Sequence, residues 1–419
     1  MSKRAAPSKS FDFDPVRAKA RERDPRGHAV HAWFAAAAAA FMTGPTSYAE
    51  FALVPVFIYT LLRLWVLGDA LLLLPRRALP LLLMGFAAWL FAGILWTDAP
   101  RNVALDEPGN LRWCIAIAMF WPILDRRGLV VRGLVFGLVL GQLVQFYHGL
   151  GELLGFETPF DRFAGRVSGW WDPAVSGGVL TVALGLQLPS ALMGRGRARW
   201  IAIGLAMAAA IGLAATGSRG GWLAAMGMVF VGLVVAIRTG KGRHAASVCI
   251  AAGVLGAGVA AATPAIRDRV SSAFEQVSAS VEEGDYSGDV GARLAMAVSA
   301  SHAFASSPVV GVGTAGYAAW AQSRGDAYLP LHDHAHNTWF HLAACNGIVG
   351  VGLFGAVFVF ALRGSIGWAK GAIGSARAGP LFALIGLAFF SLFDTLHASQ
   401  QTAAMLAALF ALSMRGNRE

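Results

Sequence analysis

The sequence predicts an all-α integral membrane protein with about twelve transmembrane helices. Of its 419 residues, 56% are hydrophobic and only 14% are charged, whereas about 25% of the residues of a soluble domain are charged. The mean hydropathy is +0.57, and the apolar residues are grouped into runs. Because a helix needs about 20 mainly apolar residues to cross a bilayer, these runs predict membrane spans.

The predicted spans are separated by charged residues or by glycine and proline, and some are short for a spanning helix. We place them at approximately residues 30–46, 51–68, 79–96, 111–124, 129–153, 173–193, 200–216, 219–237, 245–262, 338–362, 379–394 and 398–414. The polar tail before them, residues 1–29, lacks the apolar core and cleavage site of a signal peptide. The first span is therefore expected to be retained.

Lysine and arginine are distributed unevenly between the two sides of the predicted membrane. Short loops rich in these residues remain in the cytoplasm. With the N-terminus inside, the inner loops hold sixteen of them, the short outer loops and their edges hold five, and the N-terminal tail adds eight. Both termini, including residues 415–419, are therefore expected to be cytoplasmic. The net charge of +10 follows from this topology, and no nucleic acid partner is expected.

One long polar segment interrupts the spans. Residues 263–337 lie between the nine predicted spans of residues 30–262 and the three of residues 338–414, on the outer side. Thr263-Pro264 is typical of a helix start, and apolar residues then recur at intervals of three and four, as on one face of a helix. GDYSGD ends this helix, a second one follows, and SPVVGVGTAG is rich in turn residues. We expect a large, partly helical outer loop, and loops of this length are usually functional.

The end of this loop carries three histidines at alternate positions, His332, His334 and His336, followed by Asn337 at the start of the tenth span. On a strand all three would share one face. Such imidazoles can bind a metal, one of them can act as a base near neutral pH, or the group can be a polar loop end at the membrane interface. The metal interpretation lacks an HExxH motif and a cysteine cluster, because the three cysteines all fall within predicted spans.

The asparagine after His336 extends this pattern to a family motif. His336-Asn337, followed by a span with Gly347 and Gly350, resembles the His-Asn-x-x-Leu…Gly-x-x-Gly motif of the O-antigen ligase and polymerase superfamily, with Phe340 in place of the leucine. Three more segments resemble motifs of this family and follow in its order, so that the resemblance covers residues 166–354. They are Arg166-Val167-Ser168-Gly169 with Asp172-Pro173, Thr216-Gly217-Ser218-Arg219-Gly220, and Gly291-Ala292-Arg293-Leu294 with the turn Pro308–Gly313.

The resemblance implies a role for each of the charged residues in these motifs. Arg219, Arg293 and Arg166 would hold the pyrophosphate of a lipid-linked sugar donor, because guanidinium groups match phosphate with paired hydrogen bonds. His336 would be the general base that takes a proton from an acceptor hydroxyl, in one displacement with inversion that needs no metal and no cofactor. Structural alternatives remain, such as helix-end anchoring for Arg219 or an ion pair with Asp289 for Arg293.

Three further residues are expected to support the site: Asn337, Ser218 and Asp172. For Asn337, capping of the tenth span is favoured over orienting the imidazole. Asp394 and His397 fall in the outer turn between the last two predicted spans. A plain interfacial turn is favoured there over a part in the site.

By this resemblance the chain is expected to be an O-antigen ligase of the bacterial inner membrane. It would transfer a glycan from undecaprenyl pyrophosphate to lipid A-core among the membrane lipids, with catalytic residues on the periplasmic loop 263–337. An O-antigen polymerase or a protein O-oligosaccharyltransferase is the alternative, and the long outer loop directly before the His-Asn motif favours the ligase. A secondary transporter is disfavoured, because transporters gather polar residues near the midplane of two related halves.

Overall fold

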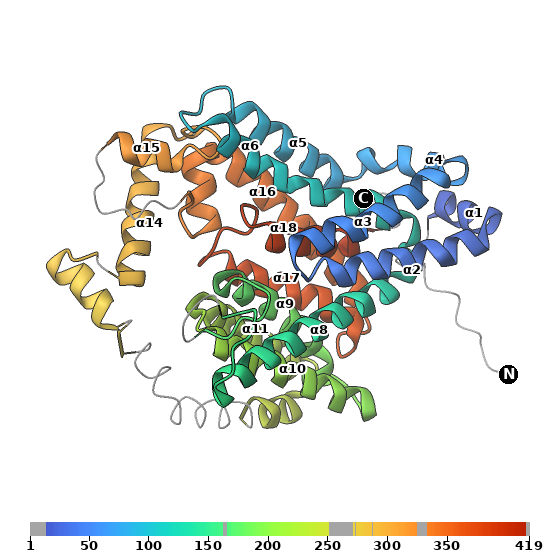
Figure 1. Cartoon of the computed structure of the whole chain (residues 1–419). Helices are drawn as coiled ribbons and strands as arrows, with labels where there is room; N and C mark the ends of the chain where they lie inside the picture. The colour runs from blue at the N-terminus through green and yellow to red at the C-terminus, as the bar shows by residue number, and fades with distance from the viewer. Residues whose placement is uncertain are drawn as a thin grey trace.

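The computed structural model describes residues 14–161, 166–250, 271–324 except 273 and 287, and 333–415. All regular secondary structure in these residues is helical, which confirms the predicted class (Figure 1). The helices are α1 (Pro15–Arg23), α2 (Pro25–Phe41), α3 (Thr46–Leu62), α4 (Leu64–Leu72), η1 (Leu74–Arg76), α5 (Ala78–Gly93), α6 (Arg101–Gly109), η2 (Asn110–Cys114), α7 (Ile115–Phe120), η3 (Trp121–Arg126), α8 (Arg127–Leu154), α9 (Pro173–Met193), α10 (Gly196–Thr216), α11 (Arg219–Arg238), η4 (Ala279–Glu283), α14 (Gly288–Ser306), α15 (Tyr317–Ser323), α16 (Thr338–Ala369), η5 (Ala376–Ala378), α17 (Gly379–Phe390) and α18 (Gln400–Ser413).

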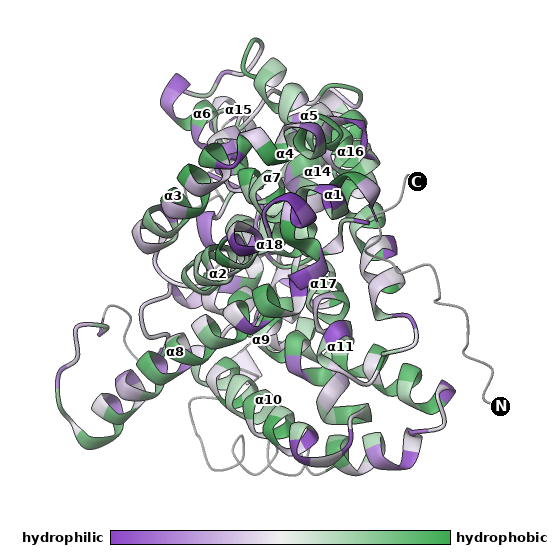
Figure 2. Cartoon of the chain, turned by 90° about the vertical axis from the view of Figure 1, so that its right-hand side faces the viewer, coloured by the Kyte–Doolittle hydropathy of each residue, from purple (hydrophilic) through white to green (hydrophobic). Residues whose placement is uncertain are grey.

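Five helical stretches of the described residues are long and apolar enough to cross a membrane, or six if α3 and the bent segment after it count as one span. Hydrophobic residues dominate helices such as α8 and α10, and hydrophilic residues gather toward helix ends (Figure 2). The five stretches are Arg101–Leu154, Val175–Met193, Gly196–Thr216, Arg219–Arg238 and Thr338–Ala369.

The predicted number of twelve spans is not confirmed and stays a prediction. Helices do occur at several of the other predicted positions, but α2, α5 and α18 have only 17, 16 and 14 residues, fewer than the roughly 20 of a typical span. Most of the predicted span at residues 245–262 lies outside the described residues.

The predicted second span, residues 51–68, is sharply bent. Helix α3 meets the following helical segment at Arg63 with an angle of 97°. The buried Arg63 side chain donates a hydrogen bond from Nε to Asp24 (2.8 Å), and its Nη1 lies 3.0 Å from His31 Nδ1. A buried guanidinium needs such polar partners, and the bend lets Arg63 face α2 instead of lipid.

Helices α9 and α18 are largely buried, and small residues allow neighbouring helices of the molecule to pack closely. In α9, 83% of the most apolar window is buried, and residues 402–413 of α18 are all buried. A Cβ atom on Gly185 of α9 would lie 2.6 Å from the backbone nitrogen of Ala383 in α17, and one on Gly133 of α8 would overlap the carbonyl oxygen of Ala36 in α2. Close backbone approach through small residues is typical of helices that pack in lipid.

The turn after α14 inserts into a break in α16. Gly347 interrupts α16 with φ 63° and ψ −166°, which only glycine adopts readily. The N–H groups of Val312 and Gly313 then donate to the carbonyl oxygens of Ala344 (2.9 Å) and Cys345 (3.0 Å), and the N–H of Ile348 donates to that of Pro308 (2.9 Å). These bonds pair the backbone groups that the break releases and fix α14 against α16.

Replacing Gly347 by alanine is expected to lower the free energy of unfolding by about 2–4 kcal/mol, because the added Cβ forces a strained backbone and meets the turn. That Cβ would overlap the carbonyl oxygen of Val309. Gly352→Ala in the same helix is the matched control, since no atom lies within 4 Å of its added Cβ. Thermal midpoints of the two purified variants in detergent make the comparison, and equal midpoints would contradict the described insertion.

Candidate active site

Asn337 fixes the start of α16. Its side-chain oxygen accepts hydrogen bonds from the backbone N–H groups of Trp339 (2.9 Å) and Phe340 (3.1 Å), and its side-chain nitrogen donates to the carbonyl oxygen of Leu392 (2.8 Å). Asn337 is thus the N-cap of the helix, which pairs amide groups that the first turn leaves without partners. The cap also ties the helix start, and therefore the neighbouring His336, to the chain that follows α17.

The turn between α17 and α18, residues 391–399, packs against the same helix start. The N–H of Thr338 donates to the carbonyl oxygens of Ser391 (2.9 Å) and Asp394 (3.1 Å). The Thr338 hydroxyl donates to the carbonyl oxygen of Asp394 (2.8 Å) and accepts from the N–H of Leu396 (3.0 Å). Because Thr338 is fully buried, water does not compete for these bonds, and Asp394 is held beside the histidine segment.

His336, His334 and Asp394 form a cluster at this junction. Nδ1 of His336 lies 3.6 Å and Nε2 of His334 lies 3.8 Å from the same carboxylate oxygen of Asp394, and the two imidazole centroids are 4.4 Å apart. Burial alone would raise the pKa of Asp394, but the close polar contact with His336 and the charges of both histidines outweigh it, so this pKa lies below its ordinary value. The carboxylate is therefore ionised at neutral pH.

Arg293 lies on the second turn of α14 and is mostly buried. Burial lowers the pKa of its guanidinium, the charges of Asp394 and Asp289 raise it, and the charges of Arg219 and Arg166 lower it further, with a net decrease. All four neighbours are therefore close enough for their charges to act on Arg293. The three arginines expected to bind pyrophosphate thus lie in one region of the molecule together with Asp394.

Arg219 is the first residue of α11, directly after the chain reverses from α10. Gly217 ends α10 with φ 65°, and Ser218 is the N-cap of α11, where its hydroxyl accepts from the N–H of Gly221 (3.3 Å). Nη2 of Arg219 donates to the hydroxyl of Ser272 (3.3 Å), whereas its buried Nη1 has no hydrogen-bond partner among the described residues. Leaving a buried donor unpaired is costly, so this edge of Arg219 is suited to an anionic oxygen.

Arg166 begins a segment that is fixed against α10. The N–H of Val167 donates to the carbonyl oxygen of Ala215 (3.1 Å), just before the reversal that carries Arg219. Asp172, at the end of this segment, is exposed and accepts through its backbone oxygen from the N–H of Ser176 (2.7 Å) at the start of α9. The structure therefore places Asp172 at a helix start.

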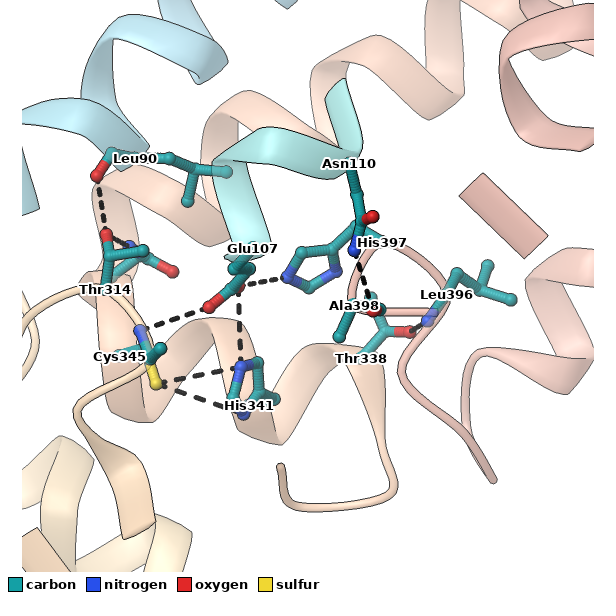
Figure 3. Close-up of polar contacts among 12 residues, drawn as sticks. Leu90, Glu107, Asn110, Thr314, Thr338, His341, Cys345, Leu396, His397 and Ala398 are labelled. Atoms are coloured by element: carbon teal, nitrogen blue, oxygen red, sulfur yellow. Dashed lines mark hydrogen bonds and ion pairs between the residues drawn. The ribbon is translucent and has the colours of Figure 1, made fainter. Parts of the chain in front are cut away.

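Sequence reasoning missed two parts of this region. Asp394, for which a plain interfacial turn was favoured over a part in the site, lies within 3.8 Å of both histidines, and its charge acts on Arg293. A second group is buried next to the first: the carboxylate of Glu107 contacts both His341 and His397 (Figure 3). Glu107 had no signal in the sequence, and Asp394 and His397 had only their place in an outer turn, because their partners are distant in the chain and no motif spacing connects them.

Three groups of side chains in the described part of the chain could hold a metal ion, each with ligand atoms within 4.8 Å of one another. Imidazole and carboxylate are common zinc ligands. The group of His334, His336 and Asp394 matches the metal interpretation of the alternating histidines, although His332 lies outside the described residues. The groups are His334, His336 and Asp394; Glu107, His341 and His397; and His148, Glu152 and Asp161.

Comparison with known families supports the resemblance of the four motifs. The family model described as O-antigen ligase matches residues 203–355. The matched segment includes Arg219, Arg293 and His336, and it leaves Arg166 and Asp394 outside. No curated protein matches the chain.

Replacing Asn337 by alanine is expected to lower the free energy of unfolding by about 1 kcal/mol, because the first turn of α16 loses its cap. Asn337→Ser keeps a side-chain oxygen that can cap the helix and loses only the bond to Leu392, so its thermal midpoint should stay close to that of the wild type. The midpoints of both purified variants test this. An equal decrease in both would show that the bond to Leu392 matters and the cap does not.

Proposed function

Because the segment that carries Arg219, Arg293 and His336 matches the family model described as O-antigen ligase, we propose that the chain is an O-antigen ligase. In this proposal it is a metal-independent, inverting glycosyltransferase. It transfers an O-antigen glycan from undecaprenyl pyrophosphate to a sugar hydroxyl of lipid A-core in lipopolysaccharide biosynthesis. The observation that carries the proposal is that the charges of Arg219, Arg166 and Asp394 all act on Arg293, and that Asp394 lies 3.6 Å from Nδ1 of His336.

A pyrophosphate-linked donor fits the charges of this region. The charges of Arg219 and Arg166 act on Arg293, so an anion in this region is attracted by all three guanidinium groups. The buried Nη1 of Arg219 offers a hydrogen bond that phosphate oxygen can accept. As the bond to the anomeric carbon breaks, negative charge grows on the phosphate oxygen, and donors already in place stabilise that charge most effectively.

Activation of the acceptor is assigned to His336. Its imidazole takes the proton of the acceptor hydroxyl while the hydroxyl oxygen bonds to the anomeric carbon, and the lipid pyrophosphate leaves with the electrons of the broken bond. Attack from the face opposite the leaving group inverts the anomeric configuration. Asp394, ionised and 3.6 Å from Nδ1 of His336, stabilises the imidazolium that forms, as a carboxylate does for a catalytic histidine.

The ligase is preferred to its relatives because the long polar segment directly precedes His336 and the other outer segments are short. A polymerase would use the same donor with a second carrier-linked glycan as acceptor. A protein O-oligosaccharyltransferase would use a hydroxyl of a protein. A secondary transporter is disfavoured, because the family match favours glycosyl transfer.

The proposed location is the bacterial inner membrane, with several spans, both termini in the cytoplasm and the active site on the periplasmic face. The lysine and arginine distribution supports this orientation. It puts Arg219, Arg293 and His336 on one side of the membrane, where a lipid-linked donor presents its pyrophosphate at the interface.

His336→Gln is expected to lower the rate of glycan transfer by about 10²–10⁴-fold, the usual contribution of a general base. The assay uses reconstituted membranes with a lipid pyrophosphate-linked donor and lipid A-core acceptor, with and without EDTA. His302→Gln, an exposed histidine on α14, is the matched control and should transfer at the wild-type rate.

Three other outcomes of this transfer assay would each contradict a different part of the proposal. Full activity of His336→Gln would reject the base assignment. Loss of wild-type transfer in EDTA would favour a metal held by His334, His336 and Asp394. Transfer only to a carrier-linked glycan would replace the ligase by a polymerase.

Arg293→Met is expected to lower kcat by about 10²–10³-fold, as removal of a preorganised group at a developing anion does. Arg293→Lys keeps the charge but loses the paired geometry, so its rate should be intermediate. Arg101→Met removes an exposed arginine and serves as the control. Steady-state transfer rates of the three variants make the test, and an unchanged rate for Arg293→Met would remove Arg293 from the site.

A further inference from the structure

A buried carboxylate outside the matched family segment is connected to the proposed site. Glu107 on α6 is 5% exposed, and its partners His341 and His397 are 1% and 2% exposed. We propose that Glu107 is a positioning residue for glycan transfer, which sets the relative placement of Asp394, His336 and Arg293. This inference rests on the proposed function and names a residue that no family motif includes.

The carboxylate of Glu107 contacts three different parts of the chain (Figure 3). Its Oε1 lies 2.6 Å from Nε2 of His397 and 3.4 Å from Nε2 of His341. Its Oε2 accepts a hydrogen bond from the N–H of Ala315 (3.1 Å). A buried carboxylate with partners on several elements resists their separation, because the loss of any partner leaves charge in an apolar interior.

Each of the three contacted elements also carries a residue of the proposed site. His397 belongs to the turn 391–399 that holds Asp394. His341 lies on the first turns of α16, just after His336 and its cap. Ala315 belongs to the turn that follows α14, the helix of Arg293. Glu107 therefore contacts the three segments that position His336, Asp394 and Arg293.

Backbone strain occurs at the same places. Ala315 (φ 55°) and His336 (φ 46°) are the non-glycine residues with positive φ in the described part of the chain. This conformation costs about 1 kcal/mol or more for a residue with a side chain, so surrounding bonds must hold it. Glu107 binds the N–H of Ala315 directly, and its partner His341 lies edge-on to His334, with ring centroids 6.4 Å apart.

The short distance between Glu107 and His397 favours this role over metal binding. Two ligand atoms on one zinc ion stand roughly 3 Å apart, because each lies about 2 Å from the metal at a tetrahedral angle. Nε2 of His397 and Oε1 of Glu107 are 2.6 Å apart, which is a direct hydrogen bond. Asn110, next to α6, adds a second tie by donating to the carbonyl oxygen of Ala398 (2.8 Å).

The test compares Glu107→Gln with Arg127→Gln in reconstituted membranes. Arg127 is also buried, and it joins α8 to the end of α18 by donating to the carbonyl oxygens of Leu412 (2.8 Å) and Met414 (2.9 Å). Both variants should lower the thermal midpoint. Only Glu107→Gln should lower kcat per folded protein, by about 10-fold to 100-fold, as small misplacement of reacting groups does, with the donor KM within about 2-fold.

A second readout does not depend on activity. In protein labelled with ¹⁵N-histidine, the imidazole signals of His334 and His336, assigned by substitution, should shift in Glu107→Gln and stay in place in Arg127→Gln. The proposal would be overturned if Glu107→Gln left the imidazole signals unshifted or kcat unchanged. It would also be overturned if the wild type held one zinc ion per chain and Glu107→Gln held none. If the signals shift in Glu107→Gln but the wild type transfers a glycan to no acceptor, the ligase function would be rejected and the positioning role of Glu107 retained.

Discussion

The hydrogen bonds between the turn 308–313 and the broken helix α16 determine how the candidate site is assembled. In an apolar environment every backbone N–H and C=O group needs a partner. The break at Gly347 releases carbonyl groups of α16, and the inserted turn supplies the N–H groups that pair with them. Since neither partner satisfies its backbone alone, α14 with Arg293 is fixed relative to the helix start that carries His336.

The site is built on elements whose ends are capped or paired, which limits the motion of its side chains. Asn337 caps α16, and Ser218 caps α11 next to Arg219. The turn 391–399 is bonded through buried Thr338. Catalytic geometry requires placement to within about half an ångström. Here the capped and paired backbone limits the motion of His336, whose side chain is 16% exposed.

The helical class and the local motifs could be predicted from the sequence, because apolar runs and short motifs involve neighbouring residues. The structure confirms the class, and Arg219 and Arg166 lie near enough to Arg293 for their charges to lower its pKa. Asp394 and Glu107 could not be found in this way, because their roles arise from helix packing between distant segments. The bend at Arg63 has the same origin, since it depends on Asp24 near the preceding helix. Span counting from hydropathy assumes straight helices and cannot foresee such a partner.

The arginine charges that act on Arg293 have a consequence for turnover. In the proposed reaction the donor carries its pyrophosphate as a diester, and the released lipid carries one more ionisable oxygen on the same group. Guanidinium groups that stabilise the developing charge also attract the finished anion more strongly than the donor. In that reaction the spent carrier leaves more slowly than an unreacted donor would, and an enzyme that removes or dephosphorylates the carrier would govern how often this site can be used.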